Sequence, residues 1–180
     1  MSALLGLVMI FALSSPRPGV APQVPTETAK TEKAIDPAME ILGRMVGGTW
    51  RTTGSFVAEF KYEWRIKGKA IRAVGVIAKG TKDEFPAESL YGWDAEAKKV
   101  YYLDFHGHET IFKGIAEAKD GKFTGEFSGL VGDKGTYRFE DELVDNDTLV
   151  ATLFGKGKDG GWVKVHSLTF KRIKQRAADR

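Results

Sequence analysis

The chain has 180 residues, of which 42% are hydrophobic and 28% charged, and this length suits one domain with one core. Its 27 basic residues are nearly balanced by 24 acidic ones, and no basic stripe is interleaved with aromatic residues, so we expect no nucleic-acid partner. The absence of cysteine excludes disulfides, thiolate metal sites and cysteine nucleophiles.

The first residues have the composition of a signal peptide. Ala3 to Leu13 is an uninterrupted apolar run that is too short to span a bilayer comfortably, and the small residues Ala12 and Ser14 suit cleavage after Ser14. We therefore expect a signal peptide at residues 1–14, a secreted or periplasmic location, and no integral membrane span after its removal. A buried or amphipathic helix is the alternative, although prolines follow at once and no polar stripe interrupts the run.

A proline-rich linker and one short helix are predicted next. Residues 15–34 combine prolines with small and polar residues, a composition that buries too little surface to fold. Asp36 and Pro37 suit the start of a helix, and Gly47 and Gly48 suit its end. Between them the apolar residues recur at helical spacing: Ala38, Ile41, Leu42, Met45 and Val46. We expect this helix to cover one end of the following domain.

From Thr49 onward the chain has the pattern of strand after strand joined by short turns. In residues 60–66 large apolar residues alternate with charged ones, which indicates a strand with one buried face. Turn sequences such as Lys119-Asp120-Gly121 recur between such runs, and most connections are too short for anything but antiparallel neighbours. We predict an all-β, up-and-down antiparallel barrel of about eight to ten strands over residues 35–172, followed by a basic tail at 173–180.

The alternation also predicts which residues face the interior. Where the opposite face carries charge, the inward residues are Phe60, Tyr62, Trp64, Phe123, Phe127, Tyr137, Phe139 and Asp141. Gly125 and Gly129 share this face and would leave space beside the rings. The acid Asp141 is the exception to the apolar character of the wall.

For two strands the alternation does not decide which face points inward. In the last strand Trp162, Lys164, His166, Leu168 and Phe170 share one face, and we favour this face as the inward one. In the strand at 100–106, one face has Val100, Tyr102, Asp104 and His106, and the other has Tyr101, Leu103 and Phe105.

Three segments carry a resemblance to a known family. The expected helix runs into Gly48-Thr49-Trp50, Tyr91-Gly92-Trp93-Asp94 runs into a strand, and Asp159-Gly160-Gly161-Trp162 opens the last strand. In this order and spacing the chain, from about residue 36 to 172, resembles a lipocalin-like family of small bacterial proteins of unknown function. The resemblance implies a calycin-type barrel, similar to lipocalins and fatty-acid-binding proteins, with an internal cavity and an unassigned ligand. It also implies that Trp50 packs across the barrel base and that Arg172 covers it.

We expect such a barrel to bind a small, mostly apolar molecule, which the polar side chains of Asp141 and His166 would orient. One alternative is an enzyme of isomerase, cyclase or decarboxylase type, in which a carboxylate and an imidazole transfer protons inside the barrel. The interior polar residues available for such chemistry are Asp104, Asp141, His166, Tyr62, Tyr102 and Tyr137. Another alternative is a filled barrel that acts through its surface. The motifs of serine hydrolases, phosphate loops and zincins are absent from the chain.

The histidines are the candidate ligands for haem or a metal ion. Nitrobindin-like barrels, which the start of the domain also resembles, ligate haem through a histidine near the C-terminal strand, and His166 stands in a comparable place. The segment after Trp50 lacks the Pro-Thr-Ile element of that family, so no cofactor is the main expectation. His106, His108 and Glu109 lie within four residues, but at a predicted hairpin tip that faces solvent, so we expect a turn rather than a metal site.

Overall fold

The single helix forms where its capping residues predict. In the computed structural model, which describes residues 35–173, α1 spans Pro37–Met45. The Asp36 side chain accepts a hydrogen bond of 2.9 Å from the backbone N–H of Ala38. Gly47 and Gly48 have φ angles of 88° and 72°, which a residue with a Cβ rarely adopts, and they turn the chain into the first strand. The helix buries one face, made of Ala38, Met39, Leu42 and Met45.

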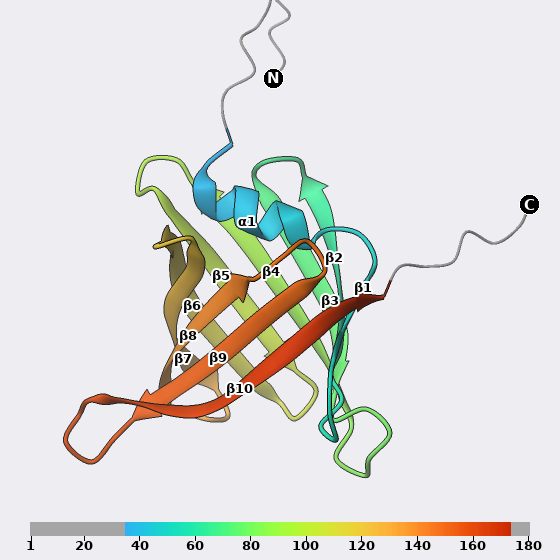
Figure 1. Cartoon of the computed structure of the whole chain (residues 1–180). Helices are drawn as coiled ribbons and strands as arrows, with labels where there is room; N and C mark the ends of the chain where they lie inside the picture. The colour runs from blue at the N-terminus through green and yellow to red at the C-terminus, as the bar shows by residue number, and fades with distance from the viewer. Residues whose placement is uncertain (1–34, 174–180) are drawn as a thin grey trace, which may run out of the picture. The chain divides into compact units, whose positions relative to one another are not determined.

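Ten strands follow and close into one antiparallel barrel (Figure 1). They are β1 (Thr49–Thr52), β2 (Glu59–Ile66), β3 (Ala70–Ile77), β4 (Phe85–Asp94), β5 (Lys99–His106), β6 (Thr110–Lys119), β7 (Lys122–Val131), β8 (Thr136–Leu143), β9 (Thr148–Lys156) and β10 (Trp162–Ile173). Each strand pairs with its neighbours in sequence, and β1 also pairs with β10, which closes the ring. The predicted up-and-down barrel with one N-terminal helix is therefore confirmed, and it is consistent with a calycin-like fold.

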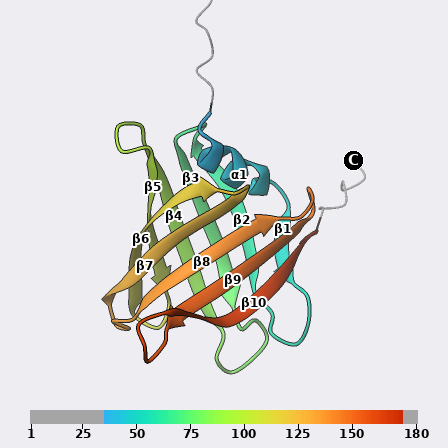
Figure 2. The same ribbon diagram turned by 60° about the vertical axis from the view of Figure 1, so that its left-hand side comes forward.

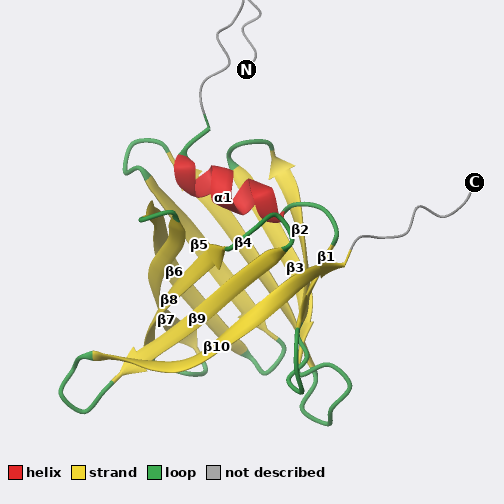
Figure 3. Ribbon diagram, in the orientation of Figure 1, coloured by secondary structure: helices red, strands yellow, loops and turns green. Residues whose placement is uncertain are grey.

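The helix lies across one end of the barrel, as both views show (Figures 1 and 2). Figure 3 makes the contrast plain, with one helix against a wall made of strands. The turns after β1, β3, β5, β7 and β9 lie at the opposite end, which we call the far end. Within residues 35–173, no helix is long and apolar enough to cross a membrane.

Trp50 and Arg172 close the helix end. Trp50 is fully buried, and its indole N–H donates a 2.7 Å hydrogen bond to the carbonyl oxygen of Met45, the last residue of α1. The guanidinium of Arg172 lies 4.5 Å from the centre of the Trp50 ring and donates to the carbonyl oxygens of Arg44, Val46 and Gly47. It satisfies carbonyls that the helix end leaves free. The covering of Trp50 by Arg172, implied by the family resemblance, is thus present.

The inward glycines do not open space as predicted. A Cβ on Gly125 would come within 2.4 Å of the carbonyl oxygen of Ile115, and one on Gly129 within 1.3 Å of that of Asp133. Both glycines therefore allow the backbone of a neighbouring segment to approach closely, rather than leaving part of the interior empty.

A bulge in β10 overturns the predicted face of that strand. The register against β9 shifts between Lys164 and His166, so Trp162 pairs with Lys156 while Leu168 pairs with Ala151. One extra residue reverses the alternation. Trp162 and Lys164 consequently lie on the outer face, where the Lys156 ammonium sits 3.7 Å from the centre of the Trp162 ring. Only Leu168 and Phe170 keep the predicted inward packing as core residues.

Replacing Trp50 by Phe tests the closure of the helix end. The change removes the indole N–H, so the Met45 carbonyl loses its donor inside the core, and we expect the free energy of unfolding to fall by about 1–3 kcal/mol. Urea unfolding followed by circular dichroism measures this. Arg51→Gln is the matched control, because Arg51 is half exposed in a surface ion pair with Glu59 and its loss should change stability by less than about 1 kcal/mol. Equal losses in the two variants would contradict the role of Trp50.

Candidate functional site: the barrel interior

Aromatic side chains form a continuous wall along one side of the interior. Tyr102 contacts Tyr91 and Phe139, with ring centres 5.6 and 5.7 Å apart. Phe139 lies 5.4 Å from Phe123, and further toward the far end Phe127 stacks on Tyr137 at 5.3 Å. Tilted and edge-to-face contacts of this kind contribute stability beyond the burial of area. The wall is thus a rigid, largely apolar surface.

The interior is not filled along its whole length. Close to α1, burial is complete, as at Val100 and Phe123, which are 0% and 1% exposed. Deeper along the barrel, Tyr62, Phe139 and Asp141 point inward yet keep part of their surface accessible. These inward residues are therefore less completely buried than those next to α1.

Asp141 is an isolated carboxylate in this space. It lies on β8, paired in register with Phe123 on one side and Ala151 on the other, both apolar. It has no hydrogen bond or ion pair with any residue between 35 and 173. Burial disfavours its charged form and raises its pKa from 3.8 to about 7. Around neutral pH the side chain therefore exchanges a proton and can either donate or accept a hydrogen bond.

Three tyrosine hydroxyls surround the same space. Burial raises the pKa of Tyr62, Tyr91 and Tyr102 above the usual value of 10, and the nearby carboxylates of Asp104 and Asp141 raise it further. These phenols stay neutral at physiological pH. The Tyr102 hydroxyl is buried and has no hydrogen-bonding partner among the described residues. The structure therefore brings Asp104, Asp141 and the tyrosines together, although they come from β2, β4, β5 and β8.

A hydrogen-bonded chain leads from the interior toward the far end. Ser89 donates to one oxygen of Asp104 at 2.9 Å, and the other oxygen lies 3.0 Å from Nε2 of His106. His106 also packs between Phe85 and Phe112, at 5.4 and 5.3 Å between ring centres. The predicted solvent-facing turn is therefore wrong for His106, which is partly buried. Because Asp104 stands between Ser89 and His106, the three do not form a nucleophile–base pair.

The remaining predicted wall residues lie apart from the polar centre. Phe60 contacts Phe170 edge to face at 6.5 Å, and Trp64 packs against Gly43 of α1 at the closed end. His166 is exposed, next to the bulge in β10. Its ring has no hydrogen bond or ring contact with the part of the chain that is described. The structure thus brings Tyr62, Phe139 and Asp141 together, while His166 keeps the predicted inward face, in register with Leu153 on β9, but is exposed.

Some interior residues escaped the sequence prediction. Tyr91 and Ser89 lie inward on β4, and the outward Glu88 just before them, paired with Arg72, was the available signal. For β5 the ambiguous face is resolved, because Val100 and Tyr102 are buried while Tyr101 and Leu103 are exposed.

The histidines and acids do not assemble a metal centre. Among residues 35–173 no three His, Asp or Glu side chains lie close enough together to hold a metal ion. A haem-ligating histidine is normally oriented by a hydrogen bond from its second ring nitrogen. His166 makes no such hydrogen bond to another residue within that range.

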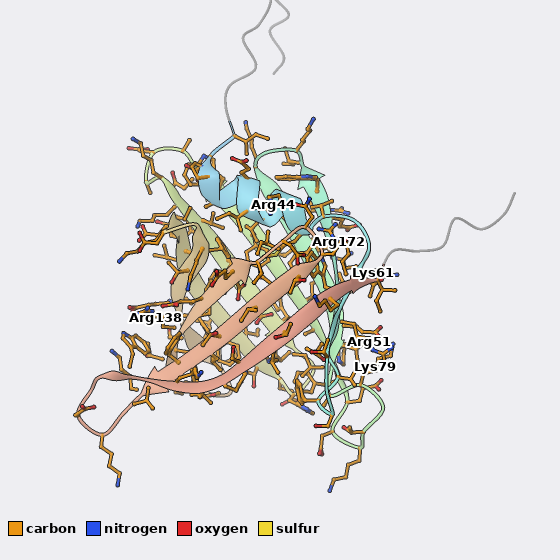
Figure 4. All side chains as sticks on the ribbon, viewed as in Figure 1. Arg44, Arg51, Lys61, Lys79, Arg138 and Arg172 are labelled. Carbon is orange, nitrogen blue, oxygen red and sulfur yellow. The ribbon has the colours of Figure 1, made fainter. Side chains whose placement is uncertain are left out.

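A groove of about 1040 Å³ lies on the outside of the barrel. It runs over β4 to β8, with outward side chains such as Leu103, Ile115 and Arg138 along it. Arg138 projects from the outer wall in Figure 4. Its lining also includes Tyr102, Gly114, Gly125 and Phe127, which are inward positions of the same strands, so the groove and the interior share part of this wall.

Comparison with known proteins does not assign this chain to a family. No family model matches the chain, and no curated protein matches it. The fold and the interior are therefore the basis on which function is argued.

The unusual pKa of Asp141 predicts a pH dependence of stability. Between about pH 4 and 7 the native protein keeps a proton on Asp141 that the unfolded chain has lost, so the free energy of unfolding falls as pH rises through this window. The difference between 3.8 and about 7 corresponds to ~4 kcal/mol at pH 8. Asp141→Asn carries no charge and should lack this decline when urea unfolding is compared at pH 5 and pH 8.

Glu142→Gln is the control for this experiment. Glu142 is the next residue, but it is exposed and lies 3.2 Å from the ammonium of Lys122 on the outer face. Its variant should keep the wild-type decline. If the free energy of unfolding of Asp141→Asn also fell between pH 5 and pH 8, Asp141 would not be the source of the pH dependence.

Proposed function

We propose that the protein binds a small, mostly apolar molecule inside the barrel, between the aromatic wall and β9–β10. The observation that carries the proposal is the accessible surface left on inward side chains such as Phe139 and Tyr62, in a barrel closed at one end by α1. Ligand sites are typically concave, lined by aromatic residues, and supplied with a few polar groups that fix orientation. Asp141 and the tyrosine hydroxyls are such groups.

A neutral hydrophobic dye, N-phenyl-1-naphthylamine, tests this proposal by fluorescence titration. Ala151→Phe should weaken dye binding by about tenfold or more, because Ala151 lies on the interior face between Asp141 and Leu168, and a larger ring fills the space beside them. Circular dichroism checks that the variant folds, since overpacking costs about 1–3 kcal/mol.

Thr152→Phe is the matched control, because Thr152 is the next residue and its hydroxyl lies 2.9 Å from Ser167 on the outer face. This variant should bind the dye like the wild type. Equal weakening in both variants, or no dye binding to the wild type, would contradict an interior site. Binding reduced only by changes in the outer groove would place the dye outside the barrel.

We also propose that the protein acts outside the cytoplasm, as a secreted or periplasmic binding protein. The support is the apolar run from Ala3 to Leu13, which lies outside the described residues. Expression of the full chain in a bacterium should yield a product whose intact mass corresponds to a start at Ser15, in the periplasm or the medium. Leu7→Arg places a charge in the run and should leave the full-length chain in the cytoplasm. Full-length wild-type chain in the cytoplasm would refute the proposal.

A further inference from the structure

The interior of β2 to β9 has acidic groups but no lysine or arginine to balance them. The inward positions of β2 to β9 include Asp104 and Asp141, and none of these positions is lysine or arginine. The basic residues labelled on the strands in Figure 4, such as Lys61 and Arg138, project from the outer wall. Arg172 lies beside α1, separated from this space by the ring of Trp50.

The two acids differ in their partners. Asp104 is held by Ser89 at 2.9 Å and by His106 at 3.0 Å, so both its oxygens are engaged. Asp141 has no partner among residues 35–173. The Tyr102 hydroxyl, on a side chain only 8% exposed, is likewise without one. Buried polar groups are normally satisfied, so two open groups facing one space indicate what a bound molecule would supply.

The chemistry of these groups defines the complementary ligand. A carboxylate on the same inward face as the rings of Tyr91, Tyr102 and Phe139 favours a cation, because aromatic rings attract cations to their faces and the carboxylate accepts charge-assisted hydrogen bonds. A fatty acid would instead bring a second negative charge close to Asp104 and Asp141, with no interior lysine or arginine to compensate it.

We propose that the interior site binds an amphiphilic amine, whose ammonium group pairs with Asp141 and whose apolar body lies along the aromatic wall. The Tyr102 hydroxyl offers a second hydrogen bond to the nitrogen or to a neighbouring polar group of the ligand. This inference rests on the proposed interior binding function and names the class of ligand that the site takes.

Binding of such a ligand is coupled to the proton on Asp141. The ionisable groups on inward positions around this carboxyl are Tyr62 from β2, Tyr91 from β4, Tyr102, Asp104 and His106 from β5, and His166 from β10. The phenols stay neutral, and burial raises the pKa of Asp141 to about 7. An alkylammonium keeps its charge there, as lysine does. It therefore pairs with the ionised form, and at pH 6 binding releases the proton from Asp141 to the buffer.

Calorimetric titration of the full mature chain with octylamine, octan-1-ol and octanoic acid tests the inference. At pH 8 we expect octylamine to bind at least tenfold more tightly than octanol, and octanoic acid to bind most weakly. Octylamine affinity should rise between pH 6 and pH 8. Its binding enthalpy at pH 6 should differ between phosphate and Bis-Tris buffers, which both take up the released proton but with different enthalpies of ionisation.

Asp141→Asn should remove the preference for the amine, its pH dependence and the buffer dependence, while octanol binding is retained. Glu142→Gln, which changes an outward acid on the same strand, should behave as the wild type. Octanol or octanoic acid binding as tightly as octylamine would overturn the amine inference and leave the interior binding function intact. Failure of all three compounds and of the neutral dye to bind would refute the binding function itself.

Discussion

The contact between Trp50, Arg172 and the end of α1 is the constraint on which the rest of the interior depends. Trp50 packs in one core with the buried face of α1, while the guanidinium of Arg172 lies over its ring and ties three backbone carbonyls of the helix end to β10. Because Trp50 also bonds to Met45, the helix cannot shift without breaking buried hydrogen bonds. One end of the barrel is thereby closed, so any exchange of the interior with solvent takes place away from α1.

This closure decides where residual space can lie. Beneath Trp50 the core is dense, with Val100 and Phe123 fully buried. Beyond it the aromatic residues gather on the side formed by β4 to β8, and Ala151 on β9 presents only a methyl group toward Asp141. The small side chain of Ala151 leaves room beside Asp141, between the larger Leu149 and Leu153 on the same face of β9.

Much of this arrangement could be predicted from the sequence, because period-2 alternation with charged residues identifies the face of a strand directly. Phe60, Tyr62, Phe139 and Asp141 were placed on the inward face in this way. The prediction failed where alternation is interrupted, since the bulge before His166 adds one residue and reverses the face of Trp162 and Lys164. It also failed for the inward glycines. They allow a neighbouring backbone to approach closely, and the sequence does not show which segment lies beside them. The convergence of Asp104 with Asp141 depends on register across four strands and is not encoded in any local pattern.

The contrast between Asp104 and Asp141 is the strongest physical reason to regard the interior as a site rather than a core. A buried acid that serves structure is expected to have partners, and Asp104 has two. Asp141 has none within residues 35–173, and because burial raises its pKa to about 7, the free energy of unfolding falls as pH rises from about 4 to 7. A leucine or asparagine at this position would avoid that cost, because neither side chain ionises. A cation bound beside the aromatic wall would remove the same cost by supplying the missing partner, and the groups around Asp141 are arranged to accept it.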